Sequence, residues 1–405
     1  MVPLNKEKAL KCLSIIVIFL FCVPHVAAAS TSYYSTSFHS NTLYTGDNML
    51  IARGSSPNST LKWNYLNGRI LPSSVASNKI VYVGSWDHNV YALNANNGAK
   101  IWNYTTGAFV ESSPAVANGI VYVGSDDHNF YALNATTGTK VWNYTTGDLV
   151  YSSPTVFNGI VYVGSVDHNV YALNTTTGAK VWNYTTGDMV HSSPTIANGI
   201  VYIGSWDHNL YALDARTGAK VWNYKTGDFV DSTGAIANGI IYIGCDDHNV
   251  YALNAATGTK VWNYTTDDLV TSSPTIFNGI VYIGSYDTNV YALDAATGTK
   301  VWNYKTGDMV DSSPTIFNGI VYVGSWDHNV YALNAATGTK MWNYTTGRWV
   351  ISSPTVFNGI VYVGSLDHNV YALNAATGTK VWNYKTVGFV NSSPTVANGI
   401  GSSLK

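Results

Sequence analysis

Apolar positions along this chain recur in short runs and lack a helical period. From residue 71 to 390 the pattern returns every 40 residues, eight times. In the second copy the runs are 112–117, 120–124, 129–134 and 140–145. Short runs rich in Val, Ile and Tyr and bounded by Gly and Asn are typical of β-strands. Each copy therefore predicts four strands, which we name A, B, C and D in chain order.

The turns and strand faces of one copy predict how these strands are arranged. Asn118-Gly119 between strands A and B is typical of a two-residue type I′ hairpin turn. Strands B (Ile-Val-Tyr-Val) and C (Val-Tyr-Ala-Leu) are apolar on both faces, so each sheet must be covered on both sides. Radially packed blades meet this need. The sequence predicts an all-β fold, an eight-bladed β-propeller of four-stranded antiparallel blades.

Proline fixes the order of the strands within a blade. Pro114 and its counterparts in the Ser-Ser-Pro segments cannot donate a ladder hydrogen bond, so strand A is expected at a sheet edge. We expect strand A to line the axial channel and strand D to form the outer edge. There, side chains such as Thr145 and Lys225 would discourage pairing between molecules.

The segments outside the repeats predict the domain organisation. Lys6, Lys8 and Lys11 precede an apolar run at 13–23, and Ala27-Ala28-Ala29 follows, so residues 1–29 are predicted to be a secretory signal peptide. An uncleaved anchor is the alternative, but Pro24 interrupts the run. Residues 30–60 are predicted to be a Ser/Thr-rich linker, 61–398 the propeller and 399–405 a tail.

Partial copies at both ends of the propeller leave its closure open. Residues 62–67 resemble an additional strand D and residues 392–397 an additional strand A. Eight complete blades at 71–390 need neither. Either two D strands compete for one outer edge, or the chain is a truncated copy of a larger ring. We predict eight blades.

Charge and cysteine content exclude several classes of function. The net charge is −2 and only 11% of residues are charged, so nothing predicts binding to nucleic acid or to an anionic membrane surface. No second transmembrane run follows the signal segment. Cys12 and Cys22 would leave with the signal peptide, so the mature chain would keep Cys245 alone and form no internal disulfide.

The end of each copy carries a recognisable motif. The run Ala-Leu-Asn-Ala-Ala-Thr-Gly-Thr-Lys-Val-Trp at 252–262 resembles the tryptophan-docking motif of pyrroloquinoline quinone (PQQ)-like propellers, and the resemblance covers more than three-quarters of the chain. It implies that each Trp packs on the Thr-Gly turn of the neighbouring blade. WD-type propellers have a similar period, but every motif Trp here precedes Asn-Tyr. The docking positions are Trp102, Trp142, Trp182, Trp222, Trp262, Trp302, Trp342 and Trp382, with Trp63 as a ninth, partial copy.

The resemblance does not extend to the family's chemistry. In quinoprotein dehydrogenases it implies adjacent cysteines, a Trp floor, Ca²⁺ ligands and a catalytic Asp supplied by insertions. This chain has no Cys-Cys pair and no insertion between 71 and 390. Its Ser, His and Asp recur at identical repeat positions, whereas a catalytic site must be singular. We predict no enzymatic activity, no catalytic residue and no cofactor.

A second motif, Asp-His-Asn, occupies the turn between strands B and C in seven of the copies, and Asp287-Thr288 replaces Asp-His in the sixth. One hypothesis is a ring that binds divalent metal or senses pH. The other is that Asp makes an Asx turn and the next residue adopts an unusual φ. Adjacent turns would lie too far apart for one ion, so we predict the Asx turn and no metal.

Differences among the copies predict a binding face. The variable positions precede Ser-Ser-Pro or follow Gly-Ser, in D-to-A and B-to-C loops that should emerge on one face of the disc. Candidate binding residues are Trp86, Trp206, Trp326, Tyr151, His191 and Tyr286. Aromatic and polar side chains on rigid strand ends suit a glycan or an envelope protein. Drift at unconstrained loop tips explains the same pattern without a ligand.

These observations predict a secreted or cell-surface binding scaffold, expected to be a monomer, with a structural component of the cell envelope as the alternative. A secreted chain also exposes sequons to glycosylation. The Asn-x-Ser/Thr sequons begin at Asn58, Asn103, Asn134, Asn143, Asn174, Asn183, Asn263, Asn343 and Asn391.

Overall fold

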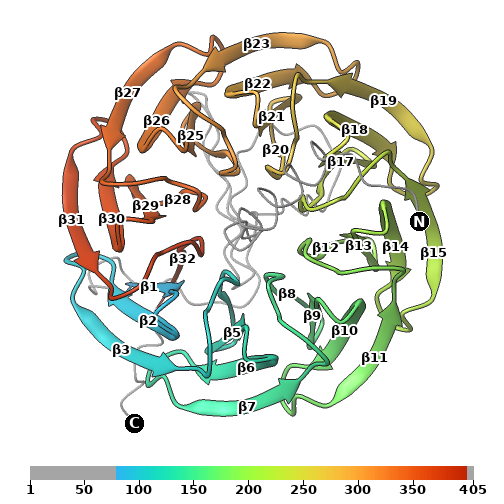
Figure 1. Ribbon diagram of the computed structural model, residues 1–405, viewed down its shortest axis with the longest axis vertical. Helices are drawn as coiled ribbons and strands as arrows, with labels where there is room; N and C mark the ends of the chain where they lie inside the picture. Colours follow the sequence, from blue (N-terminus) through green and yellow to red (C-terminus); the bar gives the residue numbers. More distant parts are fainter. Residues whose placement is uncertain (1–78, 399–405) are drawn as a thin grey trace, which may run out of the picture.

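The computed structural model describes residues 79–398, which form a closed ring of eight four-stranded antiparallel sheets (Figure 1). Each sheet runs from an inner strand A at the axis to an outer strand D at the rim, which confirms the predicted fold class. Residues 79–398 contain no helix that is long and apolar enough to span a membrane.

The strands repeat in the same order in each blade. The A strands are β4 (Ala115–Ala117), β8 (Thr155–Phe157), β12 (Thr195–Ala197), β16 (Ala235–Ala237), β20 (Thr275–Phe277), β24 (Thr315–Phe317), β28 (Thr355–Phe357) and β32 (Thr395–Asn398). The B strands are β1 (Lys79–Gly84), β5 (Ile120–Gly124), β9 (Ile160–Gly164), β13 (Ile200–Gly204), β17 (Ile240–Gly244), β21 (Ile280–Gly284), β25 (Ile320–Gly324) and β29 (Ile360–Ser365). The C strands are β2 (Asn89–Asn94), β6 (Asn129–Asn134), β10 (Asn169–Asn174), β14 (Asn209–Asp214), β18 (Asn249–Asn254), β22 (Asn289–Asp294), β26 (Asn329–Asn334) and β30 (Asn369–Asn374). The D strands are β3 (Lys100–Thr105), β7 (Lys140–Thr145), β11 (Lys180–Thr185), β15 (Lys220–Lys225), β19 (Lys260–Thr265), β23 (Lys300–Lys305), β27 (Lys340–Thr345) and β31 (Lys380–Lys385).

Strand A is shorter than predicted, because it begins after the proline. In the second blade it starts at Ala115, not at Ser112. The serines before it bond to the next blade, where the backbone N–H of Ser113 donates to Ser153 Oγ at 3.0 Å. The A–B turn is as predicted: Asn118 and Gly119 have φ values of 50° and 76°, the left-handed conformation that a type I′ turn requires.

The last strand of the chain closes the ring. β32 pairs antiparallel with β1, with Val396 opposite Val81, so the first blade combines strands from both ends of the chain. The sequence had suggested that the copy of strand A at 392–397 is surplus to eight blades. In the structure it is the inner strand of the first blade. Several predicted features lie outside the described residues. They are the signal peptide, the linker, Trp63, the partial strand at 62–67, the strand A of the first copy, which precedes residue 79, and the tail.

Tryptophan docking joins each blade to the next, as predicted. Trp102 Nε1 donates to the carbonyl of Ala135 in the following blade at 3.0 Å. Its ring covers Gly138, where a Cβ atom would lie 2.7 Å from the indole. The same contact closes the ring, because Trp382 Nε1 donates to Ala95 O at 3.0 Å.

Candidate binding face

The B-to-C and D-to-A loops lie together on one face of the disc, which we call the loop face. The backbone N–H of Asp126 in a B-to-C loop donates to the carbonyl of Phe109, in the D-to-A loop that enters the same blade, at 2.9 Å. The same bond joins Trp86 to Phe389 across the closure, at 3.0 Å. The equivalent bond is present in all eight blades, so it holds the variable B-to-C residue of each blade in place.

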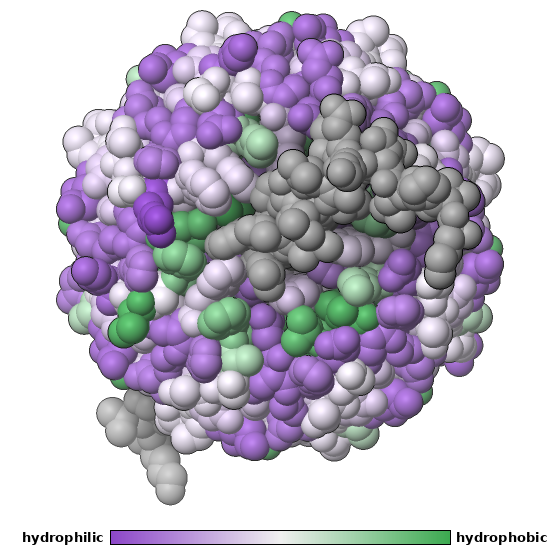
Figure 2. All heavy atoms as spheres, viewed as in Figure 1, coloured by the Kyte–Doolittle hydropathy of each residue, from purple (hydrophilic) through white to green (hydrophobic). Residues whose placement is uncertain are grey.

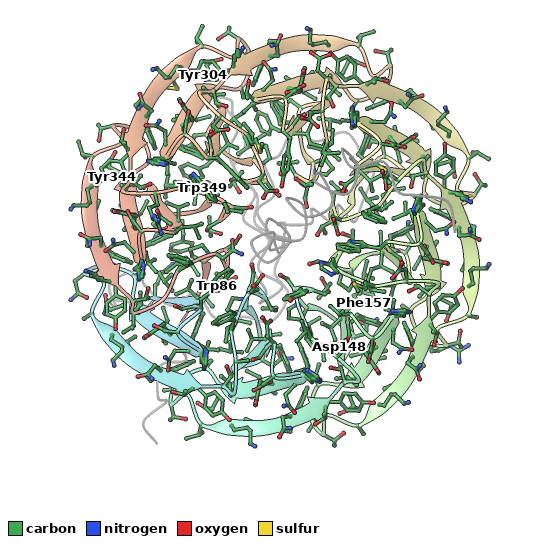
Figure 3. The ribbon with its side chains drawn as sticks, in the orientation of Figure 1. Trp86, Asp148, Phe157, Tyr304, Tyr344 and Trp349 are labelled. Atoms are coloured by element: carbon green, nitrogen blue, oxygen red, sulfur yellow. The ribbon has the colours of Figure 1, made fainter. Side chains whose placement is uncertain are left out.

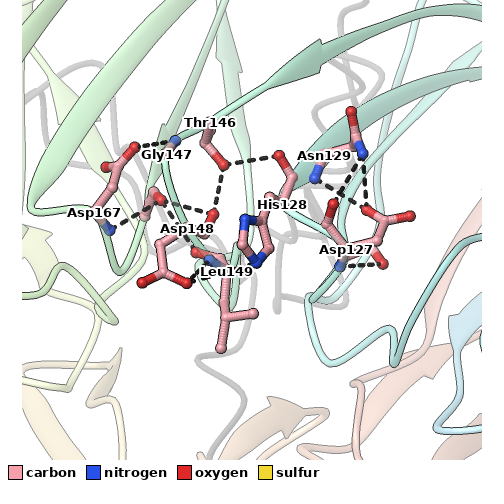
Figure 4. A network of polar contacts seen from close by, with 10 residues as sticks. Asp127, His128, Asn129, Thr146, Gly147, Asp148, Leu149 and Asp167 are labelled. Atoms are coloured by element: carbon pink, nitrogen blue, oxygen red, sulfur yellow. Dashed lines mark hydrogen bonds and ion pairs between the residues drawn. The ribbon is translucent and has the colours of Figure 1, made fainter.

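The Asp-His turns are structural, and the Asx prediction is confirmed. Asp167 Oδ1 accepts the backbone N–H of Asn169 at 3.0 Å, and His168 has a φ of 71°. Asp167 Oδ2 accepts the Tyr171 hydroxyl. It also accepts, at 2.6 Å, the N–H of Gly147 in the preceding blade (Figure 4). Each Asp therefore fastens two blades together. Within residues 79–398 no group of three or more His, Cys, Asp or Glu side chains is arranged to hold a metal ion.

The six candidate binding residues do not project as free loop tips. Tyr151, His191, Tyr286 and Trp326 are only 4–6% exposed, while Trp86 and Trp206 are half-buried. The Trp326 ring stacks on Trp349 with centroids 4.3 Å apart. Aromatic side chains at these positions therefore also contribute to packing within the loops. Apolar D-to-A residues such as Trp349 supply partners that the repeat pattern does not reveal.

The loop face is apolar near its aromatic clusters. Trp326, Ile351 and Leu366 form a small buried cluster against Met309, Trp349 and Phe389. Trp86 and Trp349 both lie inward of the outer strands in Figure 3, whereas Tyr304 and Tyr344 lie at the rim. On the face drawn in Figure 2, apolar side chains gather around the centre and polar side chains dominate the periphery.

The residue before each Ser-Ser-Pro segment lies beside the axis, and so does Asp231 before Ser-Thr-Gly, which replaces Ser-Ser-Pro in one copy. Thr271 Oγ1 donates to Asp311 Oδ1 of the next blade at 2.7 Å, and the rings of Tyr151 and His191 lie 5.0 Å apart. We call this set the axial ring, and all of its members are buried. The axial ring comprises Glu111, Tyr151, His191, Asp231, Thr271, Asp311, Ile351 and Asn391.

Carboxyl groups are concentrated around this ring, and the sequence analysis did not single them out. Glu111 and Asp231 belong to the axial ring, and the B-to-C residues Asp126 and Asp246 lie next to them in their own blades. Each was visible only as one variable loop residue. One signal in the sequence could have identified them. Two copies, 120 residues apart, have an acidic residue both before the Ser-Ser-Pro segment or its variant and in the B-to-C loop.

Burial governs the protonation of these groups. Burial raises the pKa of Asp126 to about 7, with Asp127 adding to the effect. Burial and the neighbouring Asp126 raise the pKa of Glu111 well above its usual range. The pKa of Asp246 is raised by burial and then by Asp231. His191 is shifted the other way: burial lowers its pKa to about 3, so its ring is neutral and supplies no counter-charge.

The site does not fit the quinone cofactor of related enzymes. Cys245 is buried, it stands where the other copies have Ser, and its thiol lies 3.2 Å from the carbonyl oxygen of Phe229. It has no adjacent cysteine. PQQ is itself a tricarboxylic acid, and the variable positions around Glu111 and Asp246 contain neither Lys nor Arg to pair with its carboxylates.

Two family models match the chain. The model of the outer membrane protein assembly factor BamB, from the PQQ-repeat group, matches residues 52–154 and 145–231. The β-propeller model of the beta-alanine-activating enzyme matches residues 199–396. Among proteins with curated descriptions, none matches this chain.

Solved structures share the architecture at low sequence identity. BamB from Moraxella catarrhalis has a TM-score of 0.62 and 20% identity, covering 75% of this chain and 92% of that one. The computationally designed Ika8 protein gives 0.63 and 18%, covering 71% and 97%. Quinohemoprotein alcohol dehydrogenase from Comamonas testosteroni gives 0.61 and 17%, covering 71% and 68%. These likenesses show the fold, and the match of residues 52–231 to the BamB model makes this chain a BamB-like β-propeller protein with PQQ-type repeats.

Proposed function

We propose that this protein is a non-catalytic binding scaffold of the cell envelope or cell surface, which uses its loop face to hold a partner. One observation carries the proposal. The contacts that build the ring are repeated from blade to blade, and the differences between blades are concentrated in the loops of one face. A constant frame with one variable face is the arrangement of a recognition surface.

Similarity to BamB supports the assignment to the envelope, and the predicted signal peptide agrees with it. The proposal that the chain is not an enzyme rests on the missing cysteine pair and on the acidic axial ring. Reconstitution with PQQ and Ca²⁺ tests that part. We expect no dye reduction with alcohols or sugars, and stoichiometric quinone binding with turnover would contradict it.

Site-directed crosslinking tests the binding face. Without the predicted signal peptide, which carries Cys12 and Cys22, the remaining thiol of Cys245 is buried, so a cysteine introduced on the surface can be labelled selectively with a photo-crosslinker. Asp148→Cys places the label on the loop face, and Ala256→Cys places it on an exposed C-to-D turn of the opposite face. We expect a discrete crosslinked product in envelope preparations from Asp148→Cys alone. Equal labelling from both positions, or none, would refute the assignment.

A structural envelope component is the second candidate, favoured by the outer strands. A row of about half-exposed apolar side chains encircles the rim: Ile101, Val141, Val181, Val221, Val261, Val301, Met341 and Val381. Sedimentation over a range of concentrations separates the two functions. A monomer throughout favours the binding scaffold, whereas concentration-dependent assembly favours the structural component.

A further inference from the structure

Buried carboxyl groups without partners surround the axis on the loop face. Both carboxylate oxygens of Glu111 and both of Asp246 are buried and accept no hydrogen bond, and one oxygen each of Asp126 and Asp231 is in the same state. Leaving a buried polar group unsatisfied is costly, and a charged one more so. Such groups in a native structure require an explanation, and a ligand that pairs with them is one.

The unpartnered groups lie in the axial ring or next to it. Asp246 interacts electrostatically with Asp231 and Asp311, which both belong to that ring. Glu111, itself a member of the ring, interacts with Asp126. Within this pair Asp126 is partly exposed, whereas Glu111 is fully buried. The carboxyls thus form two pairs, in the second and the fifth blade, with Asp311 two blades beyond the latter.

No basic side chain occupies either set of variable positions. The axial ring contains His191, which burial keeps neutral, and the B-to-C positions contain neither Lys nor Arg. Further acids surround the ring in the D-to-A loops, at Asp148, Asp188, Asp228, Asp268 and Asp308. Basic residues near this face are Arg348 in one D-to-A loop and Lys225, Lys305 and Lys385 at the outer ends of D strands. The charge of the loop face is therefore negative although the whole chain is nearly neutral.

We propose that the axial mouth of the loop face binds a basic peptide segment of the partner, whose lysine or arginine side chains pair with the carboxyls of Glu111, Asp126, Asp231 and Asp246. The inference rests on the proposed binding function and specifies the chemistry of the partner. A single metal ion fits less well, because no three ligands converge within residues 79–398. An extended chain carrying several cations can reach both pairs.

Aromatic side chains next to the carboxyls fix the position of one of them. Trp206 Nε1 donates to Asp231 Oδ1 at 2.7 Å. The Trp206 ring stacks on His191, with centroids 4.4 Å apart, and on Phe229, with centroids 4.7 Å apart. The indole is therefore held in place by its neighbours, and it holds one oxygen of Asp231 while the other oxygen accepts no hydrogen bond.

Fluorescence anisotropy with a labelled, end-blocked hexalysine peptide tests the proposal at low ionic strength. We expect saturable binding by the full chain that weakens with added salt, and no binding of hexaglutamate. Asp231→Asn/Asp246→Asn should weaken hexalysine binding at least tenfold, and Glu111→Gln/Asp126→Asn should do so independently. These isosteric changes remove the repulsion between the buried carboxyls of each pair, so the melting temperature should not fall. A loss of hexalysine binding can then be distinguished from a loss of folding.

The matched control removes two charges from the edge of the same face. Asp268→Asn/Asp308→Asn should change hexalysine affinity less than twofold. An equal loss in this control would overturn the axial site in favour of diffuse attraction. Absence of hexalysine binding would also overturn it, as would Ca²⁺ displacing the peptide stoichiometrically. A partner crosslinked from Asp148→Cys alongside absent hexalysine binding would refute this inference and leave the proposed function standing.

Discussion

Removing a docking tryptophan should open a joint between two blades, and Trp222 is the informative position. Its indole packs on Gly258 of the next blade and lies 5.8 Å from the Tyr202 ring, centroid to centroid. Trp222 Nε1 donates to Ala255 O at 3.0 Å. Truncating a packed Trp to Ala typically costs about 3–5 kcal/mol. We expect Trp222→Ala to lower the free energy of unfolding by that amount.

The hydrogen bond should contribute little of this loss. Ala255 O also accepts the Tyr202 hydroxyl at 2.9 Å, so it keeps a partner when the indole is removed. Trp222→Phe, which retains most of the packing, should therefore cost only about 1 kcal/mol. Val221 is 49% exposed on the same strand, and Val221→Ala should stay within about 0.5 kcal/mol of the parent.

Chemical denaturation monitored by circular dichroism measures all three variants. The expected order of stability is parent and Val221→Ala first, then Trp222→Phe, and Trp222→Ala last. If Trp222→Ala unfolds at the same denaturant concentration as Val221→Ala, the Trp222 indole does not stabilise the contact between the two blades.

Four further outcomes are expected. Val396→Asp should cost several kcal/mol by burying a charge in the closing strand β32, whereas Val387→Asp at an 82% exposed position should be nearly neutral; equal melting temperatures would contradict the closure. Trp326→Ala should lower the free energy of unfolding by about 3 kcal/mol because the ring is buried on Trp349. An unchanged stability would contradict the packing role of Trp326. The pKa of Asp126 is raised to about 7, so its contribution to stability is full below the unfolded pKa near 3.8 and is lost as the pH rises toward 7. Asp126→Asn should therefore reduce the fall of the melting temperature over that pH range. An unchanged pH profile of the melting temperature would contradict this. In a glycosylating host, mass spectrometry should find glycans at exposed Asn143 and none at Asn391, which is fully buried, and the reverse pattern would contradict the structure.

Local signals in the sequence predicted most of the blade. The bounds of strands B, C and D in the second copy coincide with β5, β6 and β7, because Asn-Gly, Asp-His-Asn and Thr-Gly turns delimit them. Strand A differs since the serines before Pro114 bond to the neighbouring blade. Closure was not predicted, because pairing between strands at the two ends of the chain leaves no local pattern. The sequence did distinguish the two copies of strand A: residues 392–399 keep Ser-Ser-Pro and Asn-Gly, whereas residues 72–79 have neither.

The candidate site was harder to predict than the fold. Its position on the B-to-C and D-to-A loops followed from alternating strand directions. The burial of Trp326 depends on Trp349, which varies independently in another loop, so the repeat pattern conceals the pair. The convergence of Asp231, Asp246 and Asp311 depends on how blades are placed around the axis, and a one-dimensional comparison of copies contains no such distances.

The pairing of Lys79 with Asn398 places the two ends of the described chain on neighbouring strands of one sheet. Linear arrays of repeats have end units with an uncovered side, and they need polar caps to stay soluble. A circle has no end units, so every blade here is internal and the sequence needs no cap. The same adjacency makes the breakpoint of the chain arbitrary: a circular permutant that joins these ends and begins in another A-to-B turn keeps every contact between blades.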